Sequence, residues 1–377
     1  MSERTPEPAR SASGHPAPAD LASTDPTPAG PPLHVWVDGL LVPAATPILT
    51  ATDRGFQVGD GVFETIRVCE GRILELSLHA ARLAASASAL EIPLEGDVEA
   101  TIRVAIAELL AADDLVAPGL EVSVRVTVSR GGVEGRNLLP PARVRPTMVV
   151  QAWRVAPPPT ELLERGLHLA ISGVRRDARS PLATVKTTSR AEFVYARLEA
   201  RRAGADDALF LTTDGHLAEA TSASLFLVRS VPTAARPGLR AGSREGVVRA
   251  PAVGSAGPLV DGPLADESLL DGPLVGTIVE RPPVGTIVEL ATPSLECGIL
   301  AGTTREWLLA WGLEVGLVPV QALLWPDDLF AADEAFLASS VAGVLPVTVV
   351  DGRPIGDGRP GPWTRRAREA REAFACR

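Results

Sequence analysis

The order of hydrophobic and polar residues predicts two short hairpins near the start of the chain. Residues 33–42, LHVWVDGLLV, alternate on both sides of an Asp-Gly pair, a dipeptide that favours a tight hairpin turn. Residues 61–76, GVFETIRVCEGRILEL, repeat the pattern around a Glu-Gly pair. We therefore expect each segment to form two antiparallel strands.

Two helices are predicted after these hairpins. Apolar residues recur at helical spacing over residues 77–92 and 97–114. Ser77 and Asp97 stand at the start of these segments, and both residue types accept hydrogen bonds from the free amides of a first helical turn.

Two further apolar runs, 120–132 and 145–155, are predicted to be strands connected by a glycine-rich loop at 131–139. Two helices among antiparallel strands predict a small α+β domain over residues 33–155.

A second domain is predicted over residues 161–366, after a proline-rich linker at 156–160. Residues 167–176, LHLAISGVRR, are typical of a strand. Residues 207–228 contain another Asp-Gly turn between apolar runs and predict a further hairpin.

Three segments differ from this globular pattern. Residues 1–32 hold eight prolines and predict a disordered tail. Residues 230–283 are rich in proline and glycine and contain DGPL twice, while VGTIVE occurs at 275 and again at 284. Such a pair is too short for a repeat architecture, so we expect a low-complexity surface insertion. Residues 367–377 are expected to end a C-terminal helix.

Composition narrows the class of protein. The 377 residues are 46% apolar and carry a net charge of -10, so no basic surface indicates nucleic acid or anionic membrane as a partner. Three widely spaced cysteines form neither a disulfide framework nor a zinc pattern, which favours a reducing cytoplasm and no metal. No apolar run approaches the ~18 residues of a transmembrane helix.

Lys186 is the single lysine of the chain, whereas every other long-chain cation is arginine. A lysine amine can lose its proton when desolvated and can condense with a carbonyl, which a guanidinium cannot do. Chance retention of one lysine is the competing explanation. The segment after it predicts a helix, with Ser189 and Glu192 forming a capping box and Gly204 beyond the end.

Residues 302–304, Gly-Thr-Thr, precede another predicted helix and could seat a phosphate at its N-terminus. An ordinary threonine cap is the commoner use of this pattern. Arg82, three residues after His79, could supply a cation to the same phosphate, although most arginines are solvated.

Glu219 lies between apolar neighbours in a predicted strand, where an unpaired carboxylate would be costly to bury. A protonated pyridine nitrogen would satisfy it, and a solvated strand edge is the alternative. A lone lysine, a phosphate seat and such a carboxylate together describe the requirements of pyridoxal 5'-phosphate.

Five segments resemble, in order, the signatures of the class IV aminotransferases: DRGFQVGDGVFETIRV, VKTTSRAEFVYARLEARRAGADDALFL, TDGHLAEATSASLF, GILAGTTREW and ADEAFLASSVAGVLPV. The resemblance implies a two-domain, fold-type IV pyridoxal-phosphate enzyme with α+β and α/β character. Its small N-terminal α+β domain would precede a larger C-terminal mixed-sheet pseudobarrel domain. It also implies a homodimer with the active site between the domains, completed by the partner subunit.

The resemblance assigns roles to particular residues. Lys186 would form the Schiff base and shuttle protons, and Glu219 would face the pyridine nitrogen. The phosphate would be bound by Arg82, Thr303, Thr304 and Ser340. The substrate would be bound by Arg136, Thr65 and Phe63.

The segments GDGVFETIRV and VTVSRGGVEGRNLLPP look most like the aminodeoxychorismate lyases. That implies conversion of 4-amino-4-deoxychorismate to 4-aminobenzoate and pyruvate in folate synthesis. The alternative is a transaminase of D-amino acids, branched-chain amino acids or amines. D-amino-acid transaminases usually have Arg-x-His where this chain has Arg136-Asn137-Leu138, and branched-chain enzymes have glycine at the position of Thr65. A non-catalytic scaffold is a third hypothesis, which the retained Lys186 disfavours.

Overall fold

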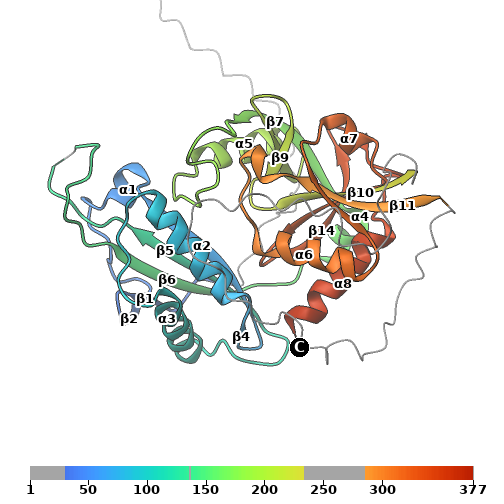
Figure 1. The fold of residues 1–377 in the computed structure, drawn as a ribbon. Helices are drawn as coiled ribbons and strands as arrows, with labels where there is room; N and C mark the ends of the chain where they lie inside the picture. The colour runs from blue at the N-terminus through green and yellow to red at the C-terminus, as the bar shows by residue number, and fades with distance from the viewer. Residues whose placement is uncertain (1–29, 136, 233–284, 377) are drawn as a thin grey trace, which may run out of the picture.

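The computed structural model describes residues 30–135, 137–232 and 285–376. Two β-sheets organise these residues, one formed by strands within residues 34–154 and one by strands within residues 167–354 (Figure 1). The predicted tail at 1–32 and insertion at 230–283 lie largely outside the described residues. Among the described helices, none combines the length and the apolar character needed to cross a membrane.

The first sheet is antiparallel, with the order β2-β1-β6-β5-β3-β4. Helices α2 and α3 pack against it, and their apolar faces share a core with β3, β5 and β6. Short helix α1 precedes β3 (Figure 1). The bounds are β1 His34–Val37, β2 Leu40–Pro43, α1 Arg54–Val58, β3 Gly61–Cys69, β4 Arg72–Ile73, α2 Leu76–Ala89, α3 Val98–Ala112, β5 Glu121–Ser129 and β6 Thr147–Arg154.

The second sheet closes on itself. Its path β10-β13-β14-β7-β8-β9 returns to β10, while β11, β12 and β15 extend it, and parallel and antiparallel pairs are mixed. This is the mixed-sheet pseudobarrel predicted for the second domain. Its strands are β7 Leu167–Arg176, β8 Asp207–Thr212, β9 Leu217–Ala220, β10 Ser224–Pro232, β11 Thr286–Pro293, β12 Val318–Ala322, β13 Glu334–Ser339, β14 Gly343–Val350 and β15 Arg353–Pro354. Its helices are α4 Thr160–Arg165, α5 Ala191–Arg202, α6 Thr303–Glu314, α7 Pro326–Phe330 and α8 Pro362–Ala375.

Local sequence signals were right where no distant contact competes. Asp38 has a φ of 48° and Gly39 a φ of 95°, so the Asp-Gly pair forms the left-handed turn expected between β1 and β2. Asp97 caps α3 by accepting a hydrogen bond from the amide of Ala100 at 3.0 Å. The strands predicted at 120–132 and 145–155 are β5 and β6.

Two predicted helix caps are wrong, and tertiary contacts explain both. Glu75, not Ser77, is the N-cap of α2, and its carboxylate binds the buried guanidinium of Arg371 at 2.7 Å. Ser189 does not cap α5, because its hydroxyl donates to the carbonyl of Gly59 at 3.1 Å instead. A bond between distant segments has thus replaced a local cap in each case.

The insertion was predicted to begin too early in the chain. Residues 230–232 belong to β10, which pairs with β11 as far as Pro232 opposite Thr286. The described chain on either side of the insertion therefore forms one strand pair. The second VGTIVE copy supplies Thr286 to Glu289 of β11, and the first copy lies outside the described residues.

Two of the three cysteines form a disulfide, which their spacing in the sequence did not indicate. Cys69 at the end of β3 is bonded to Cys376 after α8, with Cα atoms 5.8 Å apart, whereas Cys297 is free and buried. The bond joins the first sheet to the C-terminal helix, 307 positions away in sequence. The cytoplasmic location predicted from the cysteines therefore loses its support, because disulfides persist mainly in oxidising compartments.

Candidate active site

Lys186 lies in the irregular segment between β7 and α5, which packs along β3. The backbone carbonyl and the backbone amide of Lys186 each form a hydrogen bond. The amide of Phe63 donates to the Lys186 carbonyl at 3.0 Å, and the Lys186 amide donates to Ser86 Oγ at 3.3 Å. The amide of Thr188 continues the pairing by donating to the Gly61 carbonyl at 2.9 Å. The segment of Lys186, which follows β7 of the second sheet, is therefore held by β3 of the first sheet and by α2.

The side chain of Lys186 lies by an aromatic ring, with Nζ 4.8 Å from the centroid of Phe63. Loss of hydration lowers the pKa of the Lys186 amine to about 8. Glu64 opposes this shift, whereas Arg82 and Arg190 add to it. A large fraction of the amine is therefore neutral near pH 8, and only the neutral form can attack a carbonyl or accept a proton.

Glu64 lies in the middle of β3, where it is fully buried, and its carboxylate binds Arg82, a cationic residue of the site. Arg82 binds it through two nitrogens at 2.7 Å each, and His79 Nδ1 lies 2.8 Å from one of its oxygens. Burial would raise the pKa of Glu64, but these hydrogen bonds lower it to about 2. The third nitrogen of Arg82 donates to the Ala301 carbonyl at 2.7 Å, which orients this arginine toward the start of α6.

The predicted phosphate-binding site lies at the N-terminus of α6. Gly302 is the N-cap and has no side chain to accept from the first amides of the helix. Thr303 Oγ1 lies 3.3 Å from Ser340 Oγ, so two hydroxyls from different elements meet beside that helix end. The hydroxyl of Thr304 accepts from Arg371 at 3.3 Å, a contact that ties α6 to α8.

Glu219 lies in β9 opposite Ser224 of β10, where the pseudobarrel closes. Its carboxylate accepts from the Leu300 amide at 3.3 Å, and Arg176 lies 3.6 Å from the other oxygen. The residue is only 9% exposed, so the alternative of a solvated strand edge is wrong.

One cavity of about 650 Å³ brings most of the predicted residues together. They are Phe63, Thr65, Arg82, Lys186, Glu219, Thr303, Thr304 and Ser340. Arg136 lies outside the described residues, and its described neighbours Gly135 and Asn137 are not among those that line this cavity.

Among the charged residues at or beside the cavity that sequence reasoning missed are Glu64, Arg125 and Arg190. Glu64 follows Phe63 in a strand that is otherwise almost wholly buried, and this unusual position was its only signal. Arg125 of β5 places its guanidinium carbon 3.9 Å from the centroid of the Phe63 ring. The guanidinium carbon of Arg190, four residues after Lys186, lies 3.2 Å from the ring centroid of Phe193. Neither arginine has a local signal, because each reaches the cavity through strand pairing or chain folding.

The residues present fit pyridoxal 5'-phosphate. A lysine with a lowered pKa, a buried carboxylate and an uncapped helix end with two hydroxyls line the same cavity. Lys186 would bind the aldehyde carbon, Glu219 the pyridine nitrogen, and Thr303 with Ser340 the phosphate.

Comparison with known proteins agrees with this chemistry. Residues 61–259 and 288–350 match the model of the amino-transferase class IV family. A protein of Methanocaldococcus jannaschii, named as a candidate branched-chain-amino-acid aminotransferase, is 27% identical over 340 residues, 89% of this chain and 94% of its own. The D-alanine aminotransferase of Bacillus licheniformis is 25% identical over 339 residues, 90% of this chain and 95% of its own.

The fold has solved counterparts. A branched-chain amino acid aminotransferase from T.th., solved with pyridoxamine 5'-phosphate, superposes with a TM-score of 0.70, at 23% identity and over 91% of this chain and 93% of its own. The architecture, the cavity and the family match point the same way. The chain belongs to the class IV aminotransferase family and is a pyridoxal-phosphate-dependent enzyme.

Proposed function

We propose that this enzyme is a transaminase that moves an amino group between an amino acid and a 2-oxo acid. One observation carries the proposal: the amine of Lys186 lies in a strongly cationic cavity. The backbone of Lys186 is hydrogen-bonded to β3, which fixes the position of this amine. The relatives named above are aminotransferases, which supports this alternative over the aminodeoxychorismate lyase reaction predicted from the sequence.

The charge of the cavity favours an anionic substrate. Three carboxylates line it, from Asp177, Glu192 and Glu219, against Lys186 and seven arginines. A concave site of one sign raises the local concentration of oppositely charged ligands. An amino acid and a 2-oxo acid both carry a carboxylate, whereas a simple amine does not. The arginines are Arg82, Arg125, Arg175, Arg176, Arg190, Arg197 and Arg305.

The chain supplies the proton chemistry of the reaction. Pyridoxal phosphate, when bound, supplies an electron sink for the substrate. The neutral amine of Lys186 can take a proton from the substrate α-carbon and return one when the product forms. The backbone bonds to Phe63 and Ser86 keep that amine in place. With the cofactor bound, the buried carboxylate of Glu219 would lie at the pyridine nitrogen and would favour its protonated form, because a neighbouring negative charge stabilises a cation.

Separate D- and L-amino acid donors test the proposal. The protein is reconstituted with pyridoxal phosphate, and its visible absorbance is followed with D-alanine, L-leucine or L-valine before 2-oxoglutarate is added. We expect one hand of donor to remove the visible band and the 2-oxo acid to restore it. A band that no donor changes, with pyruvate release from 4-amino-4-deoxychorismate, would replace the transaminase by the lyase.

The lowered pKa of Lys186 predicts a pH dependence of cofactor attachment. Because the neutral amine is the nucleophile, the rate at which apoprotein gains the visible band should rise about tenfold per pH unit below 8 and level off above it. Stopped-flow absorbance at fixed pyridoxal phosphate measures the rate. A rise that continues to pH 10 would contradict the burial effect, because an ordinary lysine titrates there.

We include a homodimer in the proposal. Large apolar side chains are exposed around α1 and the glycine-rich loop, with Phe56 74%, Leu138 79% and Leu139 76% exposed. Exposed apolar residues gathered on one part of a surface favour burial against a partner. In a dimer the loop would serve the cavity of the second copy, which is consistent with the finding that none of its described residues lines the cavity of its own chain.

A further inference from the structure

Arg371 of α8 is a completely buried arginine that binds a carboxylate at the start of α2. Its side chain is 0% exposed. Nη1 donates to one oxygen of Glu75 at 3.0 Å, and Nη2 donates to the other oxygen at 2.7 Å. Two parallel bonds of this kind fix the orientation of a guanidinium as well as its distance from the carboxylate. Because Glu75 is the N-cap of α2, the pair joins the C-terminal helix to the helix that carries Arg82.

The same guanidinium also reaches the first turn of α6. Nη2 carries two hydrogens, and beside its bond to Glu75 it donates to Thr304 Oγ1 at 3.3 Å. Trp307 of α6 and Phe374 of α8 flank the cation, with each ring centroid 5.2 Å from the guanidinium carbon. Aromatic rings that replace water around a cation strengthen its attraction to a carboxylate. One buried side chain therefore connects α8, α2 and α6.

The contact with Arg371 determines which part the hydroxyl of Thr304 can play. A hydroxyl has one hydrogen to donate and two lone pairs that can accept, whereas a guanidinium can only donate. Thr304 Oγ1 is therefore the acceptor in this contact, and its own hydrogen can point toward an anion. Thr304 lines the cavity and belongs to the first turn of α6, at the proposed phosphate-binding site. Arg371 thus leaves Thr304 as a hydrogen-bond donor at that site.

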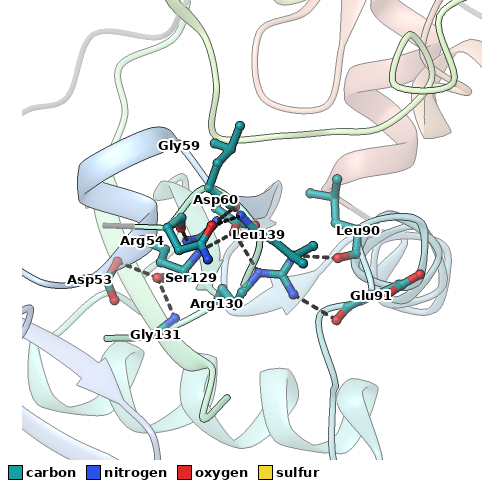
Figure 2. Close-up of polar contacts among 12 residues, drawn as sticks. Asp53, Arg54, Gly59, Asp60, Leu90, Glu91, Ser129, Arg130, Gly131 and Leu139 are labelled. Carbon is teal, nitrogen blue, oxygen red and sulfur yellow. Dashed lines mark hydrogen bonds and ion pairs between the residues drawn. The ribbon is translucent and has the colours of Figure 1, made fainter. Parts of the chain in front are cut away.

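A second buried arginine holds the opposite end of α2 (Figure 2). Arg130 is 6% exposed and donates to the carbonyls of Leu90 at 2.5 Å and Glu91 at 3.0 Å, just after the helix. Its Nε donates to a carboxylate oxygen of Asp60 at 2.7 Å. None of these three partners lines the cavity, whereas a partner of Arg371 does. The two arginines therefore share burial, a carboxylate partner and a helix, and differ in their connection to the cavity.

We infer that Arg371 is a positioning residue for the phosphate of pyridoxal 5'-phosphate. It presents the hydroxyl of Thr304 as a donor, and it holds α2 near α6, where Arg82 donates to the Ala301 carbonyl at 2.7 Å. Arg371 is not among the residues that line the cavity, so its effect on the phosphate passes through Thr304. A donor that is ordered before the anion arrives costs less conformational entropy on binding. The inference rests on the proposed function only in placing the phosphate at the start of α6.

Arg371→Met tests the inference, because methionine fills part of the same space but cannot donate a hydrogen bond to Thr304. Apoprotein is titrated with pyridoxal 5'-phosphate and, separately, with pyridoxal, which lacks the phosphate. The visible band gives the two dissociation constants. We expect the preference for the phosphorylated compound to fall about tenfold, while the affinity for pyridoxal stays the same. An unchanged preference, or an equal loss of affinity for both compounds, would overturn the positioning role.

Arg130→Met is the matched control, since it removes a buried arginine from the other end of α2. It should lower thermal stability without changing the preference for the phosphorylated compound. A fall as large as that of Arg371→Met would contradict the inference, because any loosening of α2 would then be sufficient.

If Arg371→Met fails to fold, it is combined with Glu75→Gln, which removes the carboxylate that would otherwise be buried without a counter-charge. The same tenfold fall is expected of the double variant, and an unchanged preference would again refute the role of Arg371. An unaltered protein that binds both compounds equally would show that the phosphate-binding site is wrong, and the inference would fall with it. If that protein prefers pyridoxal 5'-phosphate but turns over no donor, transamination has failed, and the comparison of the two compounds still decides the role of Arg371.

Discussion

Replacing Lys186 by arginine is expected to lower transamination by about 10⁴-fold or more. Arginine keeps the positive charge near Phe63 but cannot form the covalent bond to the cofactor or accept a proton at neutral pH. The visible band of the covalently bound cofactor should be lost as well. Steady-state kinetics and absorbance of the reconstituted protein measure both effects.

Lys186→Ala supplies the control for this result. Its smaller side chain leaves room for an added primary amine such as methylamine, which should restore part of the activity of the alanine variant but not of the arginine variant. Both variants should unfold near the temperature of the unaltered protein. An arginine variant that retains a few per cent of the activity would show that Lys186 does not carry the proton.

Replacing Glu64 by glutamine is expected to destabilise the protein by about 3 kcal/mol at neutral pH. Glu64 is fully buried and binds Arg82 through both oxygens, so the change leaves that guanidinium without its counter-charge. Urea unfolding of the two proteins measures the difference in the free energy of unfolding. The cofactor band should also weaken, because Arg82 lines the cavity.

The effect of Glu64→Gln should depend on pH in a defined direction. The pKa of Glu64 is lowered in the folded protein from 4.5 to about 2, so its carboxylate stabilises the fold above pH 4.5. That stabilisation is lost as the pH falls toward 2, and the gap between the two proteins should close over this range. Glu99→Gln, which removes an exposed partner of Arg103 on α3, is the control and should cost below about 0.5 kcal/mol. A pH-independent difference would contradict the charge argument.

The sequence alone determined the elements that depend on neighbouring residues. The Asp-Gly turn between β1 and β2 formed as predicted because both residues tolerate a positive φ. Asp97 caps α3 because its partner amide is three residues away. The single lysine led to the proposal that Lys186 is the reacting group, because the chemistry of lysine differs from that of arginine wherever the two residues lie. The order of five motifs along the chain indicated the family, because motifs are short stretches of neighbouring residues. The comparison with the family model confirms it.

The tertiary structure decided what depends on distant partners. The hydroxyl of Ser189 does not cap α5 as predicted, because it donates to the carbonyl of Gly59, 130 positions earlier in the sequence. Cys69 forms a disulfide with Cys376 because the end of β3 lies against α8. The spacing of the cysteines in the sequence could not indicate this contact. Arg125 lines the cavity from β5, the strand paired with β3, and lies over the ring of Phe63. Glu64 does not line the cavity itself, but it binds Arg82 of α2, which does. Local propensity and residue chemistry are properties of a few adjacent residues, whereas the partners of a buried charge are chosen by the packing of the whole chain.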